Sequence, residues 1–399
     1  MKLQIAIPAY NEESSIESII NLALAARGNI IASSPITDVQ ITVVSDGSTD
    51  HTVELAKRFG NDVDLVVFES NRGYGAAIKE AWNRSDADLL GFLDADGTCD
   101  PNFFSQLCNT IETEHADVAL GCRMNRQSRM PAVRRLGNLI FAWLLQVFSS
   151  RAVRDTASGM RVVRRDSLRK LLPLPDGMHF TPAMSARALL GKGIKIAEID
   201  MPYREREGES KLRVGKDGLR FLQVIVEAAF LYKPWRPLGI LSLLSLAAAA
   251  GLMVMPAAYY LAHRSVLEWM IYRFVVADLA GASACLLFCS SYLSRKIVDM
   301  TLSNEVEPDP KPAFIAKFFS SSWFWLAPLL LFLAGGLLVL PSFLELVRTG
   351  ATYEHWSRFI AMSFLFSVAI ILLVTRVMDY VLGLIEGRLS YFRSQSADP

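Results

Sequence analysis

The hydrophobic positions divide the chain into two parts. Up to about residue 235, short apolar runs alternate with amphipathic stretches, and beyond that point long apolar runs dominate. In the first part, residues 3–7 and 41–44 have the composition of strands, and each is followed by apolar residues at helical spacing. Residues 64–68 and 89–93 repeat this pattern. Such strand–helix alternation predicts an α/β domain with a parallel sheet.

The fourth of these strands ends in two carboxylates. Asp94 and Asp96 are separated by one residue, so the alternation of side chains directs both to one side, just before a turn at Gly97. Two carboxylates this close repel each other unless a cation lies between them. A hard divalent ion with open positions for phosphate oxygens fits, so the pair predicts Mg²⁺ or Mn²⁺. Two solvated aspartates in a surface turn would leave the same pattern.

Polar or glycine-containing loops follow the other three strands as well. In a parallel sheet the ligand lies at the carboxyl ends of the strands, which brings Asn11, Glu12, Asp46 and the glycines Gly73 and Gly75 to one edge. A glycine turn that opens a helix gives a phosphate close access to backbone N–H groups. The P-loop and dinucleotide-binding signatures do not occur, so neither of those nucleotide sites is expected.

The second part contains four apolar stretches that are long enough to span a bilayer. They cover about residues 238–262, 272–293, 323–346 and 359–385. Two shorter amphipathic stretches, about 135–149 and 216–237, are expected to lie in the membrane interface unless a soluble core buries them.

Composition supports a membrane protein and restricts its partners. The 399 residues are 52% hydrophobic, with a mean hydropathy of +0.28, which is too apolar for an ordinary soluble protein. A net charge of +1 and the lack of a basic tract argue against nucleic acid. The five cysteines form no CxxC pair and fit buried thiols in a reducing compartment. Because Met1 leads directly into a strand, no cleavable signal peptide is expected.

The basic residues predict an orientation. Arg295, Lys296, Lys311 and Lys317 lie between the second and third apolar stretches, whereas the other two short loops are less basic. The positive-inside rule therefore places the N-terminal domain and the C-terminus in the cytoplasm. Asp278 lies inside the second stretch, where a central charge costs roughly 3 kcal/mol on insertion scales. It is expected to pair with another helix or to face a polar path.

Several short motifs occur at the predicted strand ends. They are residues 7–12 (IPAYNE), 44–50 (VSDGSTD), 71–73 (NRG) and 94–96 (DAD), and further along 121–123 (GCR), 134–138 (RRLGN), 155–161 (DTASGMR) and 206–211 (REGESK). The first four resemble the inverting glycosyltransferases of family 2, which have the Rossmann-like GT-A fold. The whole set resembles their polyprenyl-phosphate branch, which includes dolichyl-phosphate mannose synthase and bacterial undecaprenyl-phosphate glucosyltransferases.

This resemblance implies roles for individual residues. A nucleotide-sugar donor would be bound by Pro8, Tyr10, Asn11, Glu12, Asp46, Gly73, Asp94, Ala95 and Asp96, with Asp94 and Asp96 also holding the metal. The acceptor phosphate would be bound by Arg123, Arg134, Arg135, Ser158, Arg161, Arg206, Ser210 and Lys211. The residues expected to act in catalysis are Asp96, Arg123, Arg134, Arg206 and Lys211.

The sequence departs from the family pattern in two places. Thr98 stands where some relatives have Gln, so a side-chain contact with the metal is not expected there. The Gln-x-x-Arg-Trp motif of processive polysaccharide synthases does not occur, which implies transfer of a single sugar.

We therefore predict an α/β GT-A domain followed by a four-helix transmembrane domain. The expected parts are a GT-A domain over residues 1–215, an interfacial helix and linker over 216–237, a transmembrane domain over 238–385 and a cytoplasmic tail over 386–399. The expected activity is inverting transfer of one sugar, from a UDP-glucose-type donor or GDP-mannose, to undecaprenyl or dolichyl phosphate. The protein would span the cell membrane several times, with the catalytic domain in the cytoplasm.

Two alternatives remain open. Transfer to a hydroxyl of another lipid or glycan needs a general base, and the region where relatives carry one offers only Asp176 and His179. A catalytically inactive lipid-sugar-binding or transport protein is the other alternative. The sequence leaves open the sugar, the nucleotide, the polyprenyl chain, the choice between Mg²⁺ and Mn²⁺, and whether the protein forms a homo-oligomer.

Overall fold

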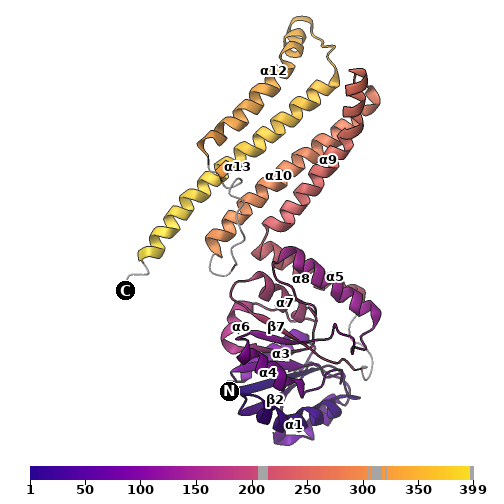
Figure 1. Cartoon of the computed structure of the whole chain (residues 1–399), viewed down its shortest axis with the longest axis vertical. Helices are drawn as coiled ribbons and strands as arrows, with labels where there is room; N and C mark the ends of the chain where they lie inside the picture. The colour runs from indigo at the N-terminus through magenta and orange to yellow at the C-terminus, as the bar shows by residue number, and fades with distance from the viewer. Residues whose placement is uncertain (205–213, 303–305, 307–316, 320, 396–399) are drawn as a thin grey trace. The chain divides into compact units, whose positions relative to one another are not determined.

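The chain forms two compact units, Met1–Ala229 and Phe230–Pro399 (Figure 1). The computed structural model describes residues 1–204, 214–302, 306, 317–319 and 321–395. The boundary between the units lies inside the segment 216–237 that the sequence assigned to an interfacial helix and linker. Three predicted site residues, Arg206, Ser210 and Lys211, lie outside the described residues, as does Lys311.

A single mixed sheet forms the centre of the first unit. Its strands, within the described part of the chain, are β1 (Lys2–Ala9), β2 (Asp38–Ser45), β3 (Asp64–Val67), β4 (Leu89–Leu93), β5 (Val118–Cys122), β6 (Met160–Arg164) and β7 (Ile196–Asp200). They lie in the order β3-β2-β1-β4-β6-β5-β7. The four strands that the sequence pattern predicted are β1 to β4, and their mutual pairings are parallel as expected.

The expectation of a wholly parallel sheet is wrong at β6. This strand is antiparallel to both of its neighbours, β4 and β5. The reason lies in where the strand begins. Met160 pairs with Leu93 at the end of β4, and the Asp94 N–H donates to the Gly159 carbonyl at 3.2 Å. The chain therefore enters the sheet at the carboxyl end of β4 and runs back along it.

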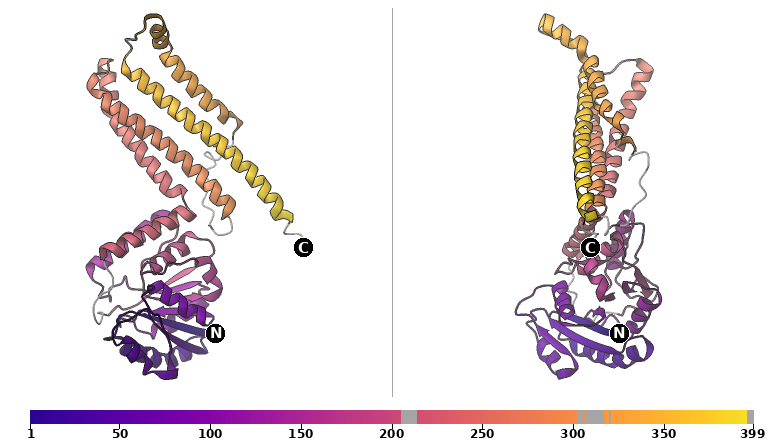
Figure 2. Two further views of the ribbon diagram at one scale, coloured as in Figure 1. Left: turned by 180° about the vertical axis from the view of Figure 1, so that it is seen from behind. Right: turned by 90° about the vertical axis from the view of Figure 1, so that its left-hand side faces the viewer.

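Helices cover both sides of the sheet (Figure 2). On one side, α1 (Ile16–Ser33), α2 (Thr52–Lys57) and α4 (Phe103–Thr113) share a core with Leu3, Ile5 and Ile7 of β1. On the other, α3 (Tyr74–Arg84), α6 (Arg165–Leu171) and α7 (Phe180–Leu190) pack on Ala6 and on Phe92 of β4. The strands β1, β4 and β5 are buried on both faces along nearly their whole length, which explains their nearly continuous apolar sequences.

Two further helices begin in the first unit, and both are amphipathic. In α5 (Ala132–Phe148), the apolar side chains Leu136, Ile140 and Trp143 are exposed, whereas Leu145 is fully buried. In α8 (Val214–Tyr232), Leu219 is 70% exposed. The first unit therefore does not bury the apolar residues of either helix completely, which is the pattern of helices that lie in a membrane interface.

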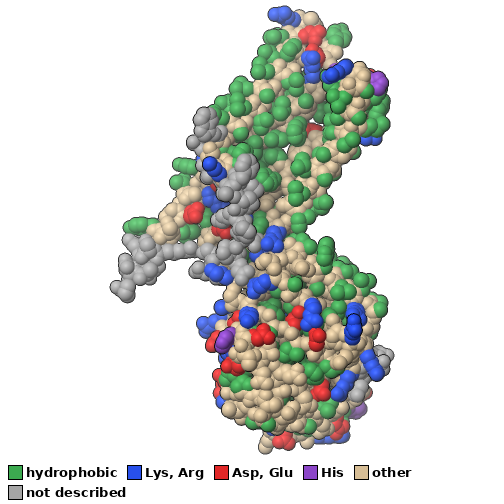
Figure 3. Space-filling view, in the orientation of Figure 1, with side chains coloured by type: hydrophobic (Ala, Val, Ile, Leu, Met, Phe, Trp, Pro, Cys, Tyr) green, Lys and Arg blue, Asp and Glu red, His purple; other side chains and the backbone are tan. Residues whose placement is uncertain are grey.

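The second unit consists of four long helices in the part of the chain that is described, and Figure 3 shows hydrophobic side chains spread over their surface. They are α9 (Trp235–His263), α10 (Ile271–Thr301), α12 (Leu326–Thr349) and α13 (Trp356–Gln395). All four are long and apolar enough to cross a membrane. Three of them contain a predicted span and extend beyond it, whereas α12 begins three residues after the start of the predicted span 323–346 and ends three residues beyond it. The helix α10 packs against α9 and α13, and α12 packs against α13 (Figure 1).

Two aspartates inside this second unit have partners on a neighbouring helix. The Ser363 hydroxyl on α13 lies 3.5 Å from Oδ2 of Asp278 on α10, so Asp278 does face another helix. The sequence analysis did not predict a second such carboxylate in this unit, the buried one of Asp379. The Asp379 carboxylate on α13 lies 2.6 Å from Lys296 Nζ and 2.9 Å from an Arg376 nitrogen, and its side chain is only 8% exposed. Pairing of this kind reduces the free-energy cost of placing charge among apolar helices.

We predict that residues 1–237 on their own bind lipid vesicles through α5 and α8. Leu136→Glu should weaken this binding about tenfold or more, because a fully buried leucine is worth roughly 1.5–3 kcal/mol. Leu22→Glu, at an exposed leucine of α1, is the matched control and should leave binding unchanged. Vesicle sedimentation measures the effect. A fragment that stays wholly in the supernatant would contradict the assignment of α5 and α8 to the interface.

Candidate functional site

A pocket of about 500 Å³ lies at the carboxyl ends of β1, β2 and β4, where the sequence placed the polar loops. All of its lining residues belong to the first unit. Ten predicted site residues line it: Pro8, Tyr10, Glu12, Asp46, Gly73, Asp94, Ala95, Asp96, Arg123 and Arg134. Apolar side chains from α5 and α8 add to the lining, among them Val133, Phe141 and Phe221.

Asp46 fixes the turn that precedes α3. Its Oδ1 accepts from the Arg72 N–H at 2.6 Å, and its Oδ2 accepts from the Gly73 N–H at 2.9 Å. Gly73 has φ +109°, and a Cβ there would lie 2.4 Å from the Asp176 carbonyl oxygen, so only glycine fits. The backbone thus engages both carboxylate oxygens of Asp46, and the nucleotide contact predicted for it stays a prediction.

Asn11 supports the pocket from outside its lining. Its Oδ1 accepts from the Thr49 N–H at 2.8 Å, and its own N–H donates to Ser48 Oγ at 3.1 Å. The residue has φ +52°, a conformation that asparagine adopts more readily than most residues. Asn11 therefore connects the loop after β1 to the loop after β2, and the donor contact predicted for it stays a prediction.

Hydroxyl groups hold the two carboxylates that follow β4. The Tyr74 hydroxyl donates to Asp94 Oδ1 at 2.6 Å. Thr98 donates to Asp96 Oδ1 from its hydroxyl at 2.6 Å and from its N–H at 3.2 Å. Burial, reinforced by the charge of Asp94, raises the pKa of Tyr74 well above its usual value. Tyr74 therefore stays protonated and remains a donor.

The donor set fits a divalent cation that is completed by substrate. Mg²⁺ is commonly held by one or two carboxylates together with substrate phosphates and waters, and Asp94 and Asp96 supply such a pair at the pocket wall. Among the residues that the structure describes, no group of three or more His, Cys, Asp and Glu side chains is placed to hold a metal.

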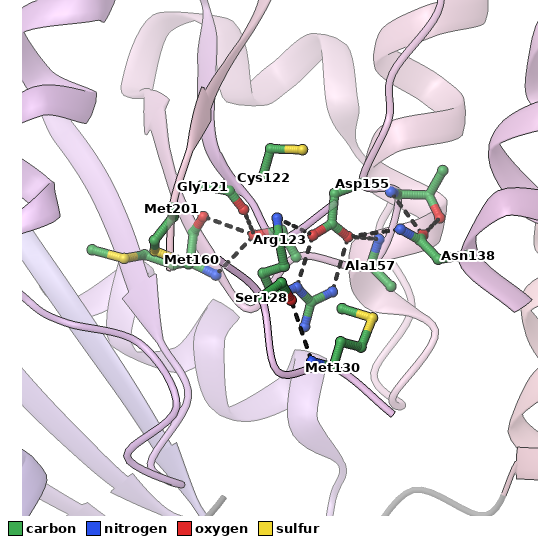
Figure 4. A network of polar contacts seen from close by, with 12 residues as sticks. Gly121, Cys122, Arg123, Ser128, Met130, Asn138, Asp155, Ala157, Met160 and Met201 are labelled. Atoms are coloured by element: carbon green, nitrogen blue, oxygen red, sulfur yellow. Dashed lines mark hydrogen bonds and ion pairs between the residues drawn. The ribbon is translucent and has the colours of Figure 1, made fainter. Parts of the chain in front are cut away.

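Arg123 reaches the pocket as half of a buried ion pair, shown in Figure 4. Its Nε and Nη2 donate to the two Asp155 carboxylate oxygens at 2.7 and 2.9 Å, and its backbone N–H donates to Oδ2 at 2.9 Å. Asn138 Nδ2 on α5 also donates to Asp155, at 3.2 Å. Burial alone would raise the pKa of Asp155, but the charge and hydrogen bonds of Arg123 lower it below the usual value.

Three predicted acceptor residues lie outside this pocket. Arg161 is 1% exposed, and its guanidinium donates to the Thr156 carbonyl oxygen at 2.7 Å and to Ser185 Oγ at 2.9 Å. Ser158 is fully buried and donates to the Gly121 carbonyl oxygen at 2.6 Å. These two side chains stabilise the segment before β6, and the acceptor contacts predicted for them stay predictions. Arg135 is exposed on another side of α5, where it lines a second pocket of about 340 Å³.

The helix α8 contributes charged residues that the sequence analysis did not predict for the site. Lys216, Asp217 and Arg220 line the pocket, together with the predicted Arg134 on α5. An Arg220 nitrogen lies 3.6 Å from the Asp217 carboxylate. The sequence pattern predicted only that this stretch lies in the membrane interface. Its charged residues were the signal that could have indicated a contribution to the pocket.

Asp176 and His179, the two residues considered as general bases, are not among the described residues that line the pocket. The pocket lining, as far as described residues form it, includes Gly177 and Met178 but neither Asp176 nor His179. The Asp176 carboxylate pairs with Lys79 Nζ at 2.7 Å. Burial, followed by the charge of Arg220, lowers the pKa of His179.

Comparison with known proteins gives the following findings. Residues 4–172 match the family described as Glycosyl transferase family 2. The chain is 32% identical over 257 residues to the low-salt glycan biosynthesis hexosyltransferase Agl6 of Haloferax volcanii, covering 62% of this chain and 59% of that protein. It is 33% identical over 217 residues to a dolichyl-phosphate hexose transferase of the same organism, covering 53% of this chain and 86% of that protein.

A likeness to a solved structure was also found. The crystal structure of glucosyl-3-phosphoglycerate synthase from Mycobacterium tuberculosis, with Mn²⁺, UDP and glucosyl-3-phosphoglycerate, aligns with a TM-score of 0.46 at 20% identity. The alignment covers 57% of this chain and 80% of the synthase chain.

We predict that Asp155→Asn destabilises the first unit by about 3–5 kcal/mol, because removing one partner leaves the buried Arg123 charge uncompensated. Glu80→Gln is the control, since it breaks the Arg84–Glu80 pair, in which the arginine is 59% exposed. Exposed pairs are worth about 1 kcal/mol or less. Urea unfolding of both variants measures the difference. Equal destabilisation by the two substitutions would contradict a structural role for the Arg123–Asp155 pair.

Proposed function

The chain belongs to glycosyl transferase family 2, and from this we propose that it transfers one hexose from a nucleotide-sugar to a polyprenyl phosphate at a membrane surface. The family match and the seven-stranded mixed sheet agree with the GT-A fold class predicted from the sequence. A glycosyltransferase activity follows from the family. The donor, the acceptor and the stereochemistry are our proposal.

One observation carries this proposal. The same pocket contains a carboxylate pair after β4, cations from α5 and α8, and apolar side chains from those two helices. A nucleotide-sugar carries a diphosphate, and a polyprenyl phosphate carries a phosphate on an apolar chain. One pocket thus contains a carboxylate pair that suits a metal-bound diphosphate, and cationic and apolar side chains that suit a lipid phosphate.

The donor is proposed to bind at the ends of β1, β2 and β4. Pro8, Tyr10, Glu12 and Asp46 would surround the nucleotide, and Asp94 and Asp96 would hold a divalent cation. When bound, this cation supplies positive charge to the diphosphate leaving group. The protein's own task at this end is to hold the sugar so that its anomeric carbon faces the acceptor.

The acceptor is proposed to bind at the side formed by α5 and α8. Arg134, Lys216 and Arg220 line the pocket there, and guanidinium groups bind phosphate oxygens in a planar, bidentate manner. Arg123 also lines the pocket, but it shares its charge with Asp155. The acceptor contacts predicted for Arg206, Ser210 and Lys211 stay predictions. An acceptor aligned opposite the leaving group gives inversion at the anomeric carbon.

Four apolar helices support a multi-pass membrane location for the whole chain. The exposed apolar residues of α5 and α8 would bring the pocket to the depth at which a lipid phosphate lies. We propose that the catalytic unit is cytoplasmic, because Arg295 and Lys296 lie in the last two turns of α10, Lys317 follows that helix, and the cytoplasmic side carries an excess of basic residues.

A phosphate acceptor does not require a general base. The second pKa of a phosphate monoester is about 6, so at neutral pH the nucleophile is already largely a dianion. A hydroxyl acceptor does require one. One observation favours that second candidate function: Asp217 on α8 is a carboxylate in the pocket lining and could accept a proton there.

We predict that Asp96→Asn lowers kcat by on the order of 10²–10³, the typical loss when one preorganised electrostatic contact is removed. EDTA should abolish turnover, and added Mg²⁺ or Mn²⁺ should restore it. Asp86→Asn, at a surface loop, is the control and should keep wild-type activity. The assay follows transfer of radiolabelled sugar from a panel of nucleotide-sugars to undecaprenyl and dolichyl phosphate. Normal turnover in EDTA would remove the metal from the proposal.

We predict that Asp217→Asn, Asp176→Asn and His179→Gln each keep more than about a tenth of the wild-type rate, a loss below about 1.4 kcal/mol. The rate should rise with pH through the acceptor's own pKa near 6, with the same midpoint in every variant. Loss of activity in Asp217→Asn, with donor binding intact, would instead assign the enzyme a hydroxyl acceptor and make Asp217 its base.

A further inference from the structure

Tyr74 and Thr98 have no part in the proposed reaction, yet each donates a hydrogen bond to one of the two carboxylates after β4. The Tyr74 hydroxyl lies 2.6 Å from Asp94 Oδ1, and the Thr98 hydroxyl lies 2.6 Å from Asp96 Oδ1. The two donors come from different parts of the chain. Tyr74 begins α3, whereas Thr98 follows the aspartates themselves. Each carboxylate is therefore bonded through one oxygen to an uncharged hydroxyl.

The ring of Tyr74 has little freedom to move. It packs edge-on against Phe92 of β4, with ring centroids 6.3 Å apart, and against Phe180 of α7 at 6.4 Å. The residue before it, Gly73, is bonded to Asp46, and the residue after it, Gly75, allows the turn to approach the Pro175 carbonyl oxygen. The turn and the aromatic contacts together direct the hydroxyl to Asp94.

The Asp94 carboxylate is held on a second side by Gly159. A Cβ at position 159 would lie 1.7 Å from Asp94 Oδ2, a distance that no side chain could tolerate. The Thr98 side chain is likewise buried, at 1% exposure, and donates to Asp96 from both its hydroxyl and its backbone. Both carboxylates thus accept hydrogen bonds from hydroxyl groups that the surrounding packing holds in place.

We propose that Tyr74 and Thr98 are positioning residues for the divalent cation, which they arrange by fixing the orientation of Asp94 and Asp96. This inference rests on the proposed function, in which the two aspartates hold that cation. A hydroxyl donor suits the task, because it orients a carboxylate and brings no positive charge of its own. Groups that orient metal ligands in this way typically contribute 10–100-fold to metal affinity.

A purely structural role for the two hydroxyls has a different consequence. If they only stabilised the loops, their removal would lower the melting temperature and leave the affinity for the cation unchanged. The affinity for Mn²⁺ therefore separates the two roles, and it does not depend on turnover.

The experiment titrates full-length protein in detergent with Mn²⁺ in the presence of UDP or GDP, and follows free Mn²⁺ by electron paramagnetic resonance. Tyr74→Phe and Thr98→Val should each weaken Mn²⁺ binding about 10–100-fold. Thr98→Ser, which keeps the hydroxyl, should restore most of the affinity. Thr113→Val, at an exposed threonine of α4, is the matched control and should bind Mn²⁺ as the wild type does.

A double-mutant cycle tests whether Tyr74 acts through Asp94. In an Asp94→Asn background, Tyr74→Phe should cause little further loss of Mn²⁺ affinity, because the interaction it serves is already gone. Independent, additive losses would overturn a positioning role for Tyr74.

The outcomes distinguish this inference from the proposed function. Wild-type protein that binds no Mn²⁺ would overturn the metal site and the inference together. Binding that is lost in Asp96→Asn but normal in Tyr74→Phe and Thr98→Val would overturn the inference alone. If melting curves show that Tyr74→Phe does not fold, the comparison of Thr98→Val with Thr98→Ser decides, since equal affinities in that pair would refute the proposal.

Discussion

The antiparallel pairing of β6 with β4 determines the geometry of the pocket. It brings the segment before β6 beside the end of β4, where Gly159 accommodates the Asp94 side chain. The same segment carries Asp155, which binds the guanidinium of Arg123 after β5. A parallel β6 would enter the sheet at the opposite edge and leave the Asp94 carboxylate without this wall.

The acidic residues around the pocket accept hydrogen bonds from two kinds of donor, a charged guanidinium and uncharged N–H or hydroxyl groups. Asp155 is bonded to an arginine, so that its charge is compensated within the protein. Asp46 is oriented by backbone N–H groups, and Asp94 and Asp96 accept from hydroxyls. Uncharged donors fix a carboxylate in place while its negative charge persists.

In the second unit, too, polar partners hold carboxylates, here among apolar helices. Asp379 is buried between α10 and α13, but Lys296 and Arg376 compensate its charge. Asp278 accepts at 3.5 Å from a serine hydroxyl on α13. Because charges among apolar helices are costly, such contacts specify which helices pack together.

Local sequence was sufficient for the strands β1 to β4, the carboxylate pair and the four apolar helices, because each depends on the residues of one segment. Tertiary structure decided the direction of β6, which depends on where a distant loop returns to the sheet. It also decided which arginines reach the pocket. Arg134 and Arg135 are adjacent in the chain, but helical geometry directs them to different pockets. Arg161 and Ser158 lie in a motif that predicts ligand binding, yet the fold uses them as internal donors, because sequence spacing does not reveal which polar groups become buried.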